Sequence, residues 1–161
     1  MSRIFVHRCD FAERLNPILH EIICKESNNK DLIDQGALMT SWKMFYPEFL
    51  EVSDCAINLL KKLGVNQSLK LIDLWGQIYK PGDFQMPHTH HPHDFSFVYY
   101  VNAPEGSSPL YFDDTKQTII PEAGKMVLFE SHVKHSVPKN NCYGRSVIAG
   151  NIEFENIILQ D

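Results

Sequence analysis

Apolar residues near the start of the chain recur at the three- and four-residue spacing of a helix that buries one face. The positions are Leu15, Ile18, Leu19, Ile22 and Ile23. They predict an amphipathic helix with Asp10 as its N-cap. Pro17 lies within this pattern, so we expect the helix to start or bend there, because proline lacks a backbone N–H. Residues 3–6 alternate like a short edge strand, and the polar residues 27–36 predict a loop.

A second helix is predicted after Pro47, because proline suits the first helical turn. Its apolar stripe consists of Phe49, Leu50, Val52, Ala56, Leu59 and Leu60. Lys61 and Lys62 suit the negative end of a helix dipole, and Gly64 is expected to end the helix. The N-terminal part of the chain is therefore expected to be largely helical.

From residue 67 the pattern changes to the period of two that is typical of strands. Residues 69–79 put six side chains on one predicted face: Leu69, Leu71, Asp73, Trp75, Gln77 and Tyr79. Further strand-like segments occupy residues 95–101, 109–114, 116–120, 125–130 and 145–159, with turns rich in glycine, proline and asparagine between them. Many short strands with such turns predict a mainly β fold, a jelly roll or barrel, with the helices packed on one sheet.

The chain of 161 residues has a length that fits one domain. We therefore treat residues 1–161 as a single domain, in which a helical and edge-strand region spans 1–66 and a β core spans 67–161. Fifteen Lys and Arg residues against twenty Asp and Glu residues give a formal net charge of −5. Because nucleic-acid-binding domains carry a basic footprint, this charge argues against a nucleic-acid partner.

Neither a membrane span nor a signal peptide is expected, because the sequence lacks the apolar runs that both require. The four cysteines are Cys9, Cys24, Cys55 and Cys142. They are scattered and form no C-x-x-C pair, which favours reduced, separate thiols in a reducing compartment. The sequence therefore predicts a soluble, cytoplasmic protein with no membrane partner.

Histidine is the unusual residue type, because six of the eight histidines lie within residues 88–135. His88 and His90 are two residues apart at the end of a predicted strand, which puts both imidazoles on one face. His135 follows the strand predicted at 125–130 and can come beside them in an antiparallel barrel. Three imidazoles suit Fe, Zn, Cu or Ni. We expect the other five to be solvated or structural: His7, His20, His91, His93 and His132.

Several motifs in residues 70–151 follow the order seen in one enzyme family. Residues 79–90 resemble the tyrosine, glycine, aromatic and H-x-D run of prolyl-4-hydroxylase-like oxygenases, which use Fe(II) and 2-oxoglutarate. Residues 96–102 resemble the next strand of that family, and residues 121–138 resemble its later histidine block. The chain thus resembles the 2-oxoglutarate/Fe(II)-dependent oxygenases, and in particular small bacterial and phage members with H-x-H in place of H-x-D.

The resemblance implies a double-stranded β-helix and a set of cofactors. Fe(II) would be held by His88, His90 and His135, with 2-oxoglutarate and O₂ as cosubstrates. The implied reaction converts 2-oxoglutarate to succinate and CO₂ while a second substrate is hydroxylated. That substrate stays open between a small molecule and a peptidyl group.

The resemblance also implies where 2-oxoglutarate binds. Arg145 lies where the family carries its cosubstrate arginine, and it is the only arginine after Arg14. An arginine suits a carboxylate because its planar fork donates two parallel hydrogen bonds. Tyr79 and Tyr100 match the two tyrosines that help to bind the cosubstrate in the family.

One position departs from the family pattern, because His90 stands where the family has a carboxylate. An all-histidine triad gives a ferrous ion no anionic protein ligand. One alternative is a cupin-type dioxygenase or isomerase that uses no 2-oxoglutarate and adds Asp94 to the three histidines. Another is a non-catalytic jelly-roll binding module. A homodimer also stays open, because the N-terminal strand can pair with a second copy or with its own sheet.

Overall fold

The computed structural model describes residues 3–27 and 36–156. These residues form two helices and ten strands. In chain order they are β1 (Ile4–Arg8), α1 (Ala12–Glu26), β2 (Leu38–Met39), α2 (Pro47–Lys62), β3 (Leu69–Tyr79), β4 (Gln85–His88), β5 (Phe95–Asn102), β6 (Leu110–Phe112), β7 (Thr118–Ile119), β8 (Lys125–Glu130), β9 (His135–Val137) and β10 (Arg145–Phe154).

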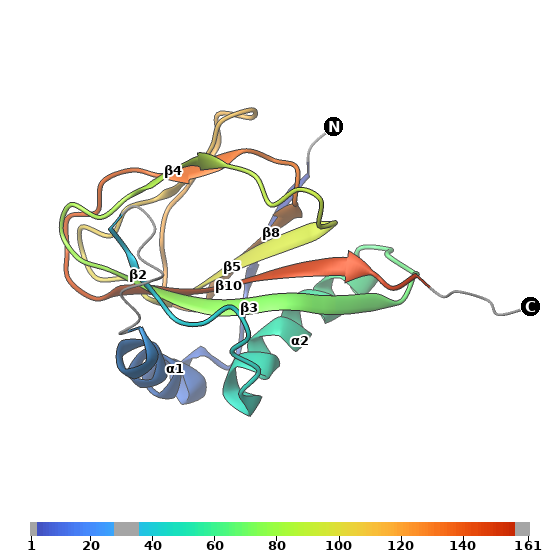
Figure 1. The fold of residues 1–161 in the computed structure, drawn as a ribbon, viewed down its shortest axis with the longest axis horizontal. Helices are drawn as coiled ribbons and strands as arrows, with labels where there is room; N and C mark the ends of the chain where they lie inside the picture. Colours follow the sequence, from blue (N-terminus) through green and yellow to red (C-terminus); the bar gives the residue numbers. More distant parts are fainter. Residues whose placement is uncertain (1–2, 28–35, 157–161) are drawn as a thin grey trace, which may run out of the picture.

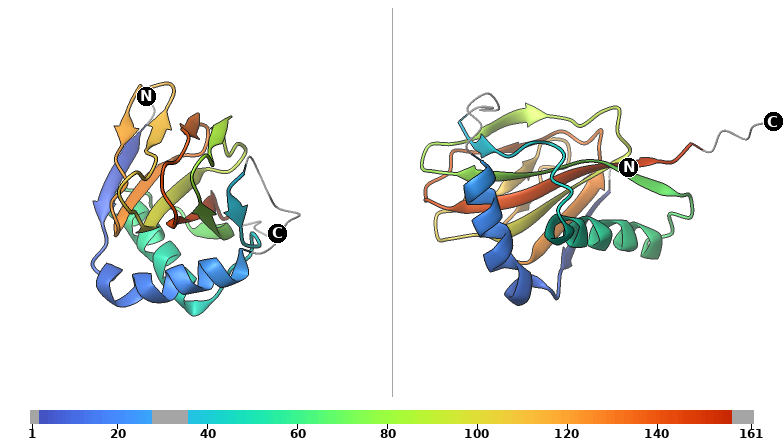
Figure 2. Two further views of the ribbon diagram at one scale, coloured as in Figure 1. Left: turned by 90° about the vertical axis from the view of Figure 1, so that its left-hand side faces the viewer. Right: turned by 60° about the horizontal axis from the view of Figure 1, so that its bottom comes forward.

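The strands form two antiparallel sheets that face each other (Figure 1). The large sheet has the order β1-β8-β5-β10-β3-β2, and the small sheet has the order β4-β9-β6-β7. Both helices lie against the face of the large sheet that points away from the small sheet (Figure 2). The mainly β, jelly-roll fold and the helices on one sheet are therefore as predicted. Strand β1 forms an outer edge of the large sheet, also as predicted.

The helices bury an apolar core against the large sheet. Leu19 and Ile23 from α1 and Phe49 from α2 are fully buried there, in contact with strand residues such as Leu74 and Ile148. Each such side chain stabilises the fold by roughly 1.5–3 kcal/mol relative to an exposed position. The helical spacing of the apolar residues is thus explained by this shared layer.

The predicted start of the first helix is wrong. Helix α1 begins at Ala12 with Phe11 as its N-cap residue, and no side chain caps it. Phe11 is buried and packs on the ring of Tyr99, with 5.4 Å between the ring centroids. Burial of this ring, rather than capping by Asp10, therefore sets the start. The helix continues through Pro17, whose exposed side lets water satisfy the carbonyl that loses its partner.

The second helix agrees with its prediction. It spans Pro47–Lys62, and Gly64 follows it with a φ of 102°, which only glycine adopts readily. The loop predicted at residues 27–36 lies outside the described residues, apart from its two ends. Neither described helix is long and apolar enough to cross a membrane.

A β-bulge in β3 overturns one predicted face. Strand β10 pairs Asn151 with Asp73 but the next residue, Ile152, with Leu71, so one residue of β3 is skipped. An extra residue reverses the side-chain alternation beyond it. Leu69 and Leu71 therefore pack towards the helices, and do not share a face with Trp75, Gln77 and Tyr79, which line the pocket between the sheets.

Candidate metal and cosubstrate site

Three histidines meet at one end of the small sheet. His88 is the last residue of β4 and His135 is the first residue of β9, and the two are register partners. His90 follows in the next turn, where its backbone N–H donates to the carbonyl of Ser131 at 2.8 Å. The ring centroids of His88 and His135 are 4.3 Å apart, and those of His88 and His90 are 5.0 Å apart.

Backbone carbonyls orient two of the three rings. His88 Nδ1 donates to the carbonyl of Met86 at 2.8 Å, and His135 Nδ1 donates to that of Val133 at 2.9 Å. In this tautomer the Nε2 atom of each ring carries a free lone pair, as a metal ligand requires. His90 Nε2 lies 3.2 Å from His135 Nε2. One ligand atom from each histidine lies within 4.8 Å of the others, so the group could hold one ion.

Burial keeps two of these imidazoles, those of His90 and His135, neutral. It lowers the pKa of His90 to about 3, with the neighbouring His135 and His88 adding to the effect. It also lowers the pKa of His135 to about 4, again with a contribution from His88. Neutral imidazole is the form that binds metals. Both ligands are therefore available without a competing proton at neutral pH.

A buried arginine shares the pocket with the histidines. Arg145, the first residue of β10, is 2% exposed, and its Nε donates to the carbonyl of Ser108 at 2.9 Å. Its guanidinium carbon lies 4.3 Å from the ring centroid of Tyr79 and 5.5 Å from that of Tyr100. Arg145 therefore belongs to the interior of the protein and not to its surface.

Arg145, which lines this pocket, and Tyr100, whose ring lies beside the guanidinium, each carry a donor without a partner. Arg145 Nη1 and the Tyr100 hydroxyl are both buried and make no hydrogen bond within the described ranges. Burial raises the pKa of Tyr100 to about 12, against the opposing charge of Arg145, so the hydroxyl keeps its proton. An unsatisfied buried polar group costs about 1–3 kcal/mol. Two adjacent ones, one of them cationic, fit an anionic ligand.

The histidines and the arginine belong to one narrow pocket. Its lining is Trp75, Gln77, Tyr79, Gln85, His88, His90, Val98, His135, Val137, Arg145, Val147 and Ala149. A metal ion and a carboxylate ligand therefore have binding groups within a single enclosure. The donor set of neutral imidazoles and a guanidinium fits an Fe(II) ion together with a dicarboxylate such as 2-oxoglutarate.

No protein-family model and no curated protein matched the sequence. Solved structures did match. A viral collagen prolyl hydroxylase from Paramecium bursaria Chlorella virus-1, solved with 2-oxoglutarate, is 14% identical with a TM-score of 0.77, over 95% of this chain and 96% of that one. A prolyl hydroxylase from Trichoplax adhaerens, solved with a peptide fragment of hypoxia-inducible factor, is 14% identical with a TM-score of 0.70, over 93% and 83%.

HygX from Streptomyces hygroscopicus, solved with nickel, 2-oxoglutarate and hygromycin B, is 13% identical with a TM-score of 0.70, over 99% of this chain and 86% of that one. The chain has the fold of the 2-oxoglutarate/Fe(II) oxygenases. This agrees with the fold that the sequence motifs implied. Within this oxygenase fold, the histidine group and Arg145 lie between the two sheets.

The cupin-type arrangement is not assembled. Asp94 Oδ2 accepts a hydrogen bond from the backbone N–H of Phe154 at 2.8 Å. It does not belong to the histidine group that could hold an ion. A carboxylate committed to the backbone at the end of β10 therefore does not complete this metal site.

Two of the five histidines expected to be solvated or structural have specific contacts. His93 lies 3.4 Å from Asp73 Oδ2 and 3.2 Å from Glu153 Oε1. His20 Nδ1 is hydrogen-bonded to the hydroxyl of Ser146 at 2.7 Å. Both are therefore structural, as one of the two expectations had it, and their partners come from strands distant in the sequence. His91 and His132 are exposed, as expected.

An aromatic pair beside the candidate metal site was not predicted from the sequence. The ring of Trp75 lies 5.9 Å from that of His90, and Trp42 stacks on Trp75 at 5.2 Å. Trp42 is 46% exposed, so the pair runs from the histidines towards solvent. The alternation of β3 puts Trp75 on the same face as Tyr79, which was the available signal. Trp42 lies before β3, and no sequence pattern pointed to it.

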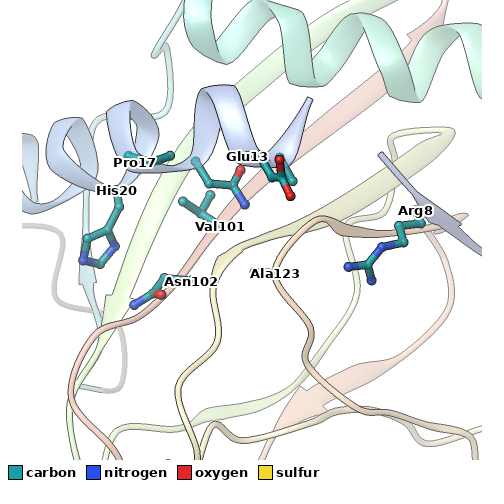
Figure 3. Close-up of a pocket in the computed structure, with 9 residues that line it drawn as sticks. Arg8, Glu13, Pro17, His20, Val101, Asn102 and Ala123 are labelled. Atoms are coloured by element: carbon teal, nitrogen blue, oxygen red, sulfur yellow. The ribbon is translucent and has the colours of Figure 1, made fainter. Parts of the chain in front are cut away.

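A much wider pocket lies elsewhere, along α1 (Figure 3). Its volume is about 400 Å³, and Glu13, Pro17 and His20 border it opposite Asn102. It holds none of the clustered metal ligands found in the described part of the chain. Size alone would therefore favour this pocket, whereas the grouping of ligands and unpartnered donors favours the narrow pocket.

Proposed function

We propose that the protein is an Fe(II)- and 2-oxoglutarate-dependent oxygenase that hydroxylates a second substrate. His88, His90 and His135 would hold the metal. Arg145, Tyr100 and Tyr79 would hold the cosubstrate. The observation that carries the proposal is a buried, unpartnered donor, Arg145 Nη1, in the pocket that the three histidines also line, with the unpartnered Tyr100 hydroxyl on the ring beside that guanidinium.

Arg145 is suited to receive the far carboxylate of 2-oxoglutarate. The bond from its Nε to Ser108 and the stacking on Tyr79 hold the guanidinium in one orientation. The unpartnered Nη1 is then left for a ligand. A carboxylate would satisfy this atom and the Tyr100 hydroxyl together, so binding would remove the cost of leaving these two buried donors without a partner.

The remaining lining supports cosubstrate binding and a dry site. The hydroxyl of Tyr79 donates to Gln85 at 3.3 Å, which fixes the ring under the guanidinium. Val98, Val147 and Ala149 form an apolar wall that excludes water from the metal. Bound Fe(II) would supply the redox chemistry that converts 2-oxoglutarate and O₂ to CO₂ and succinate while the substrate is oxidised.

The substrate class follows only from the neighbours. The Trichoplax enzyme was solved with a peptide and HygX with hygromycin B. We propose a peptidyl or small-molecule substrate that reaches the metal past the exposed Trp42. We also keep the proposal that residues 1–161 act as one domain.

Calorimetry under anaerobic conditions tests the function. The Fe(II)-loaded chain should bind 2-oxoglutarate, and Arg145→Ala should weaken binding by at least about 30-fold, since removing one partner of a buried charge pair costs 2–5 kcal/mol. The affinity of Arg145→Lys for 2-oxoglutarate should lie between those of the wild type and Arg145→Ala, because lysine keeps the charge but not the planar fork. Arg8→Ala is the matched control, because the Arg8 side chain is exposed.

A thermal melt of each variant separates a folding defect from a binding defect. Admission of air should then yield succinate from the wild-type chain. Equal affinity of the wild-type and Arg145→Ala chains, or no binding of 2-oxoglutarate by the Fe(II)-loaded wild type, would overturn the proposal.

A further inference from the structure

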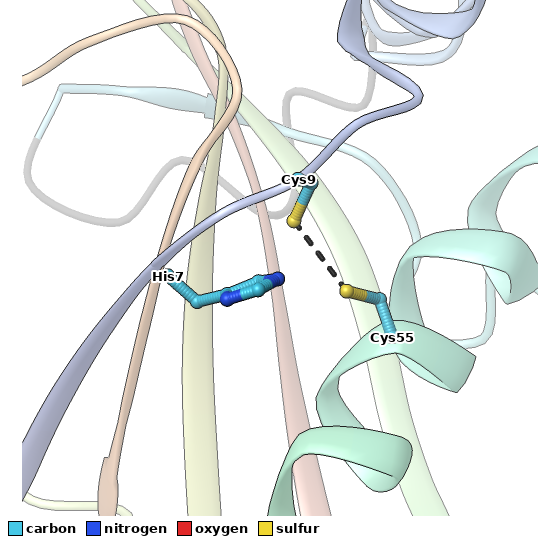
Figure 4. Close-up of side chains that lie close together, drawn as sticks. All are labelled: His7, Cys9 and Cys55. Carbon is cyan, nitrogen blue, oxygen red and sulfur yellow. Dashed lines mark hydrogen bonds between the residues drawn. The ribbon is translucent and has the colours of Figure 1, made fainter.

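A second group of metal-ligating side chains lies on the outside of the large sheet. It consists of His7 on β1, Cys9 directly after β1, and Cys55 on α2 (Figure 4). The two sulfur atoms are 3.5 Å apart. One nitrogen of His7 and the two sulfur atoms all lie within 4.8 Å of one another. All four cysteines are free thiols, as the sequence predicts, but the fold brings Cys9 and Cys55 together.

The fold holds the three residues together from two elements. The backbone N–H of Cys9 donates to the carbonyl of Gly124 at 2.8 Å, which fixes the end of β1 against the chain before β8. Helix α2 packs beside it and presents Cys55. Cys9 is 5% exposed, whereas His7 is exposed and Cys55 is half-buried. The group thus has a fixed inner ligand and an accessible outer side.

The accessible side opens into a surface cavity of about 440 Å³. Besides the three ligands, its charged lining residues are Arg8, Asp10, Glu51, Asp54 and Lys62. Glu51 pairs with Arg14 and Arg8 pairs with Glu122, which leaves Asp10 and Asp54 against Lys62. This balance favours a cation at the cavity floor, and the cavity leaves room for a water molecule beside it.

The spacing of the sulfurs fits a metal ion between them. At 3.5 Å the two thiols share a hydrogen bond (Figure 4) and are not covalently bonded, since a disulfide bond is about 2.05 Å long. With metal–sulfur bonds of about 2.3 Å, this separation corresponds to an S–metal–S angle of about 99°. That angle is closer to the tetrahedral geometry of Zn²⁺ than to the wider angles of two- or three-coordinate Cu⁺. Two thiolates and one imidazole also match the donor preference of Zn²⁺.

We propose that His7, Cys9 and Cys55 form a second metal site that binds Zn²⁺, with its fourth position open to the cavity. Binding replaces the two thiol protons, which are released to solvent, and the two thiolates neutralise the ion. The bound ion joins the edge strand β1 to α2. It therefore stabilises the attachment of the N-terminal strand by mass action, and does so independently of the proposed oxygenase site.

Titration with Co²⁺ as a spectroscopic substitute for Zn²⁺ tests the proposal. The experiment uses the full chain, reduced, with His135→Ala, which removes one of the three imidazoles between the sheets and so weakens that group as a metal site. This chain should bind one equivalent of Co²⁺ with a sulfur-to-cobalt charge-transfer band, and added Zn²⁺ should displace it. Zn²⁺ should also protect two thiols from a thiol reagent.

Variants in the His135→Ala chain identify the ligands. Cys55→Ser should abolish the band, and His7→Ala should weaken Co²⁺ binding by more than about tenfold, since loss of even an outer-shell partner costs a metal site 10–100-fold. His7 is exposed, so its removal leaves the core intact. Cys24→Ser is the matched control. Cys24 lies 3.6 Å from a nitrogen of His20, and it is not part of either metal-ligating group in the described residues.

Retention of the band in Cys24→Ser and its loss in Cys55→Ser support the proposal. It is overturned if no sulfur-to-cobalt band forms, or if His7→Ala and Cys24→Ser bind Co²⁺ equally well. It is also overturned if the reduced chain binds no metal and the two thiols only form a disulfide in air.

Discussion

The two faces of the large sheet use the same strands for different purposes. On β5, Phe97 and Tyr99 point to the helices, whereas Val98 and Tyr100 point into the space between the sheets. On β10, Ile148 belongs to the helix-side core. Its neighbours on either side, Val147 and Ala149, line the pocket. Alternation with a period of two therefore separates the two roles residue by residue.

The neighbouring tyrosines show what differs between the faces. The hydroxyl of Tyr99, on the helix side, donates to Asn16 at 2.6 Å. The hydroxyl of Tyr100, on the pocket side, is equally buried and has no partner within the described ranges. A face that only packs satisfies its polar groups, whereas a face that binds a ligand keeps some of them unsatisfied. We expect mutations on the two faces to separate stability from binding.

The largest expected effect is loss of the metal on the pocket side. His135→Ala removes the most buried of the three imidazoles and should lower affinity for Fe(II) by more than about 100-fold, because changes to outer-shell partners alone cost 10–100-fold. Metal content after dialysis against a weak chelator measures it. Retention of Fe(II) by this variant at the wild-type level would exclude His135 as a ligand.

Truncation of a core side chain on the helix side should lower stability and leave ligand binding unchanged. Leu19 is fully buried, and Leu19→Ala should lower the free energy of unfolding by about 2–5 kcal/mol through lost burial and the cavity left behind. Urea unfolding measures the loss. In the folded fraction the affinity for Fe(II) and 2-oxoglutarate should stay within twofold of wild type. A large loss of affinity there would show that the two faces are coupled.

Gly76 tests the close approach of α1 to β3. A Cβ atom at Gly76 would lie 2.7 Å from Cγ1 of Ile23, so Gly76→Ala should destabilise the fold by about 1–3 kcal/mol through overpacking. The double variant with Ile23→Ala should recover part of this loss, because the clashing atom is gone. Strictly additive unfolding energies for the two changes would contradict this contact.

The smallest and sharpest comparison exchanges each tyrosine for phenylalanine. Tyr99→Phe leaves Asn16 unsatisfied and should cost about 1–3 kcal/mol of stability, with no change in 2-oxoglutarate affinity. Tyr100→Phe removes an unpartnered hydroxyl and should leave the stability of the ligand-free chain unchanged or slightly raised. It should weaken 2-oxoglutarate binding by about tenfold, the equivalent of about 1.4 kcal/mol. If the two variants changed stability and 2-oxoglutarate affinity in the same way, the two faces would not differ in role.

Local patterns predicted much of this molecule. The ranges of β3, β5 and α2 follow directly from their apolar spacing, and the ordered motifs single out His88, His90, His135 and Arg145, which share one pocket. The errors occurred where a distant contact outweighed a local rule. Burial of Phe11 against Tyr99, rather than capping by Asp10, sets the start of α1.

Other features had no local signal. The bulge in β3 depends on its pairing with β10, and it turns Leu69 and Leu71 towards the helices. The contact between Cys9 and Cys55 joins a residue directly after strand β1 to one on helix α2, and nothing in the intervening sequence connects the two. Periodicity describes one element at a time, so it is silent on such pairs.

The order of residues alone was enough to assign the β fold, the helical stripes and the residue types of the candidate site, because side-chain alternation and helical spacing are properties of short segments. Tertiary structure decided which of these residues meet. Antiparallel pairing of β4 with β9 joins His88 to His135, and the facing sheets enclose Arg145 beside them. It also decided which donors stay unpaired, because hydrogen-bond partners of buried groups come from the whole fold.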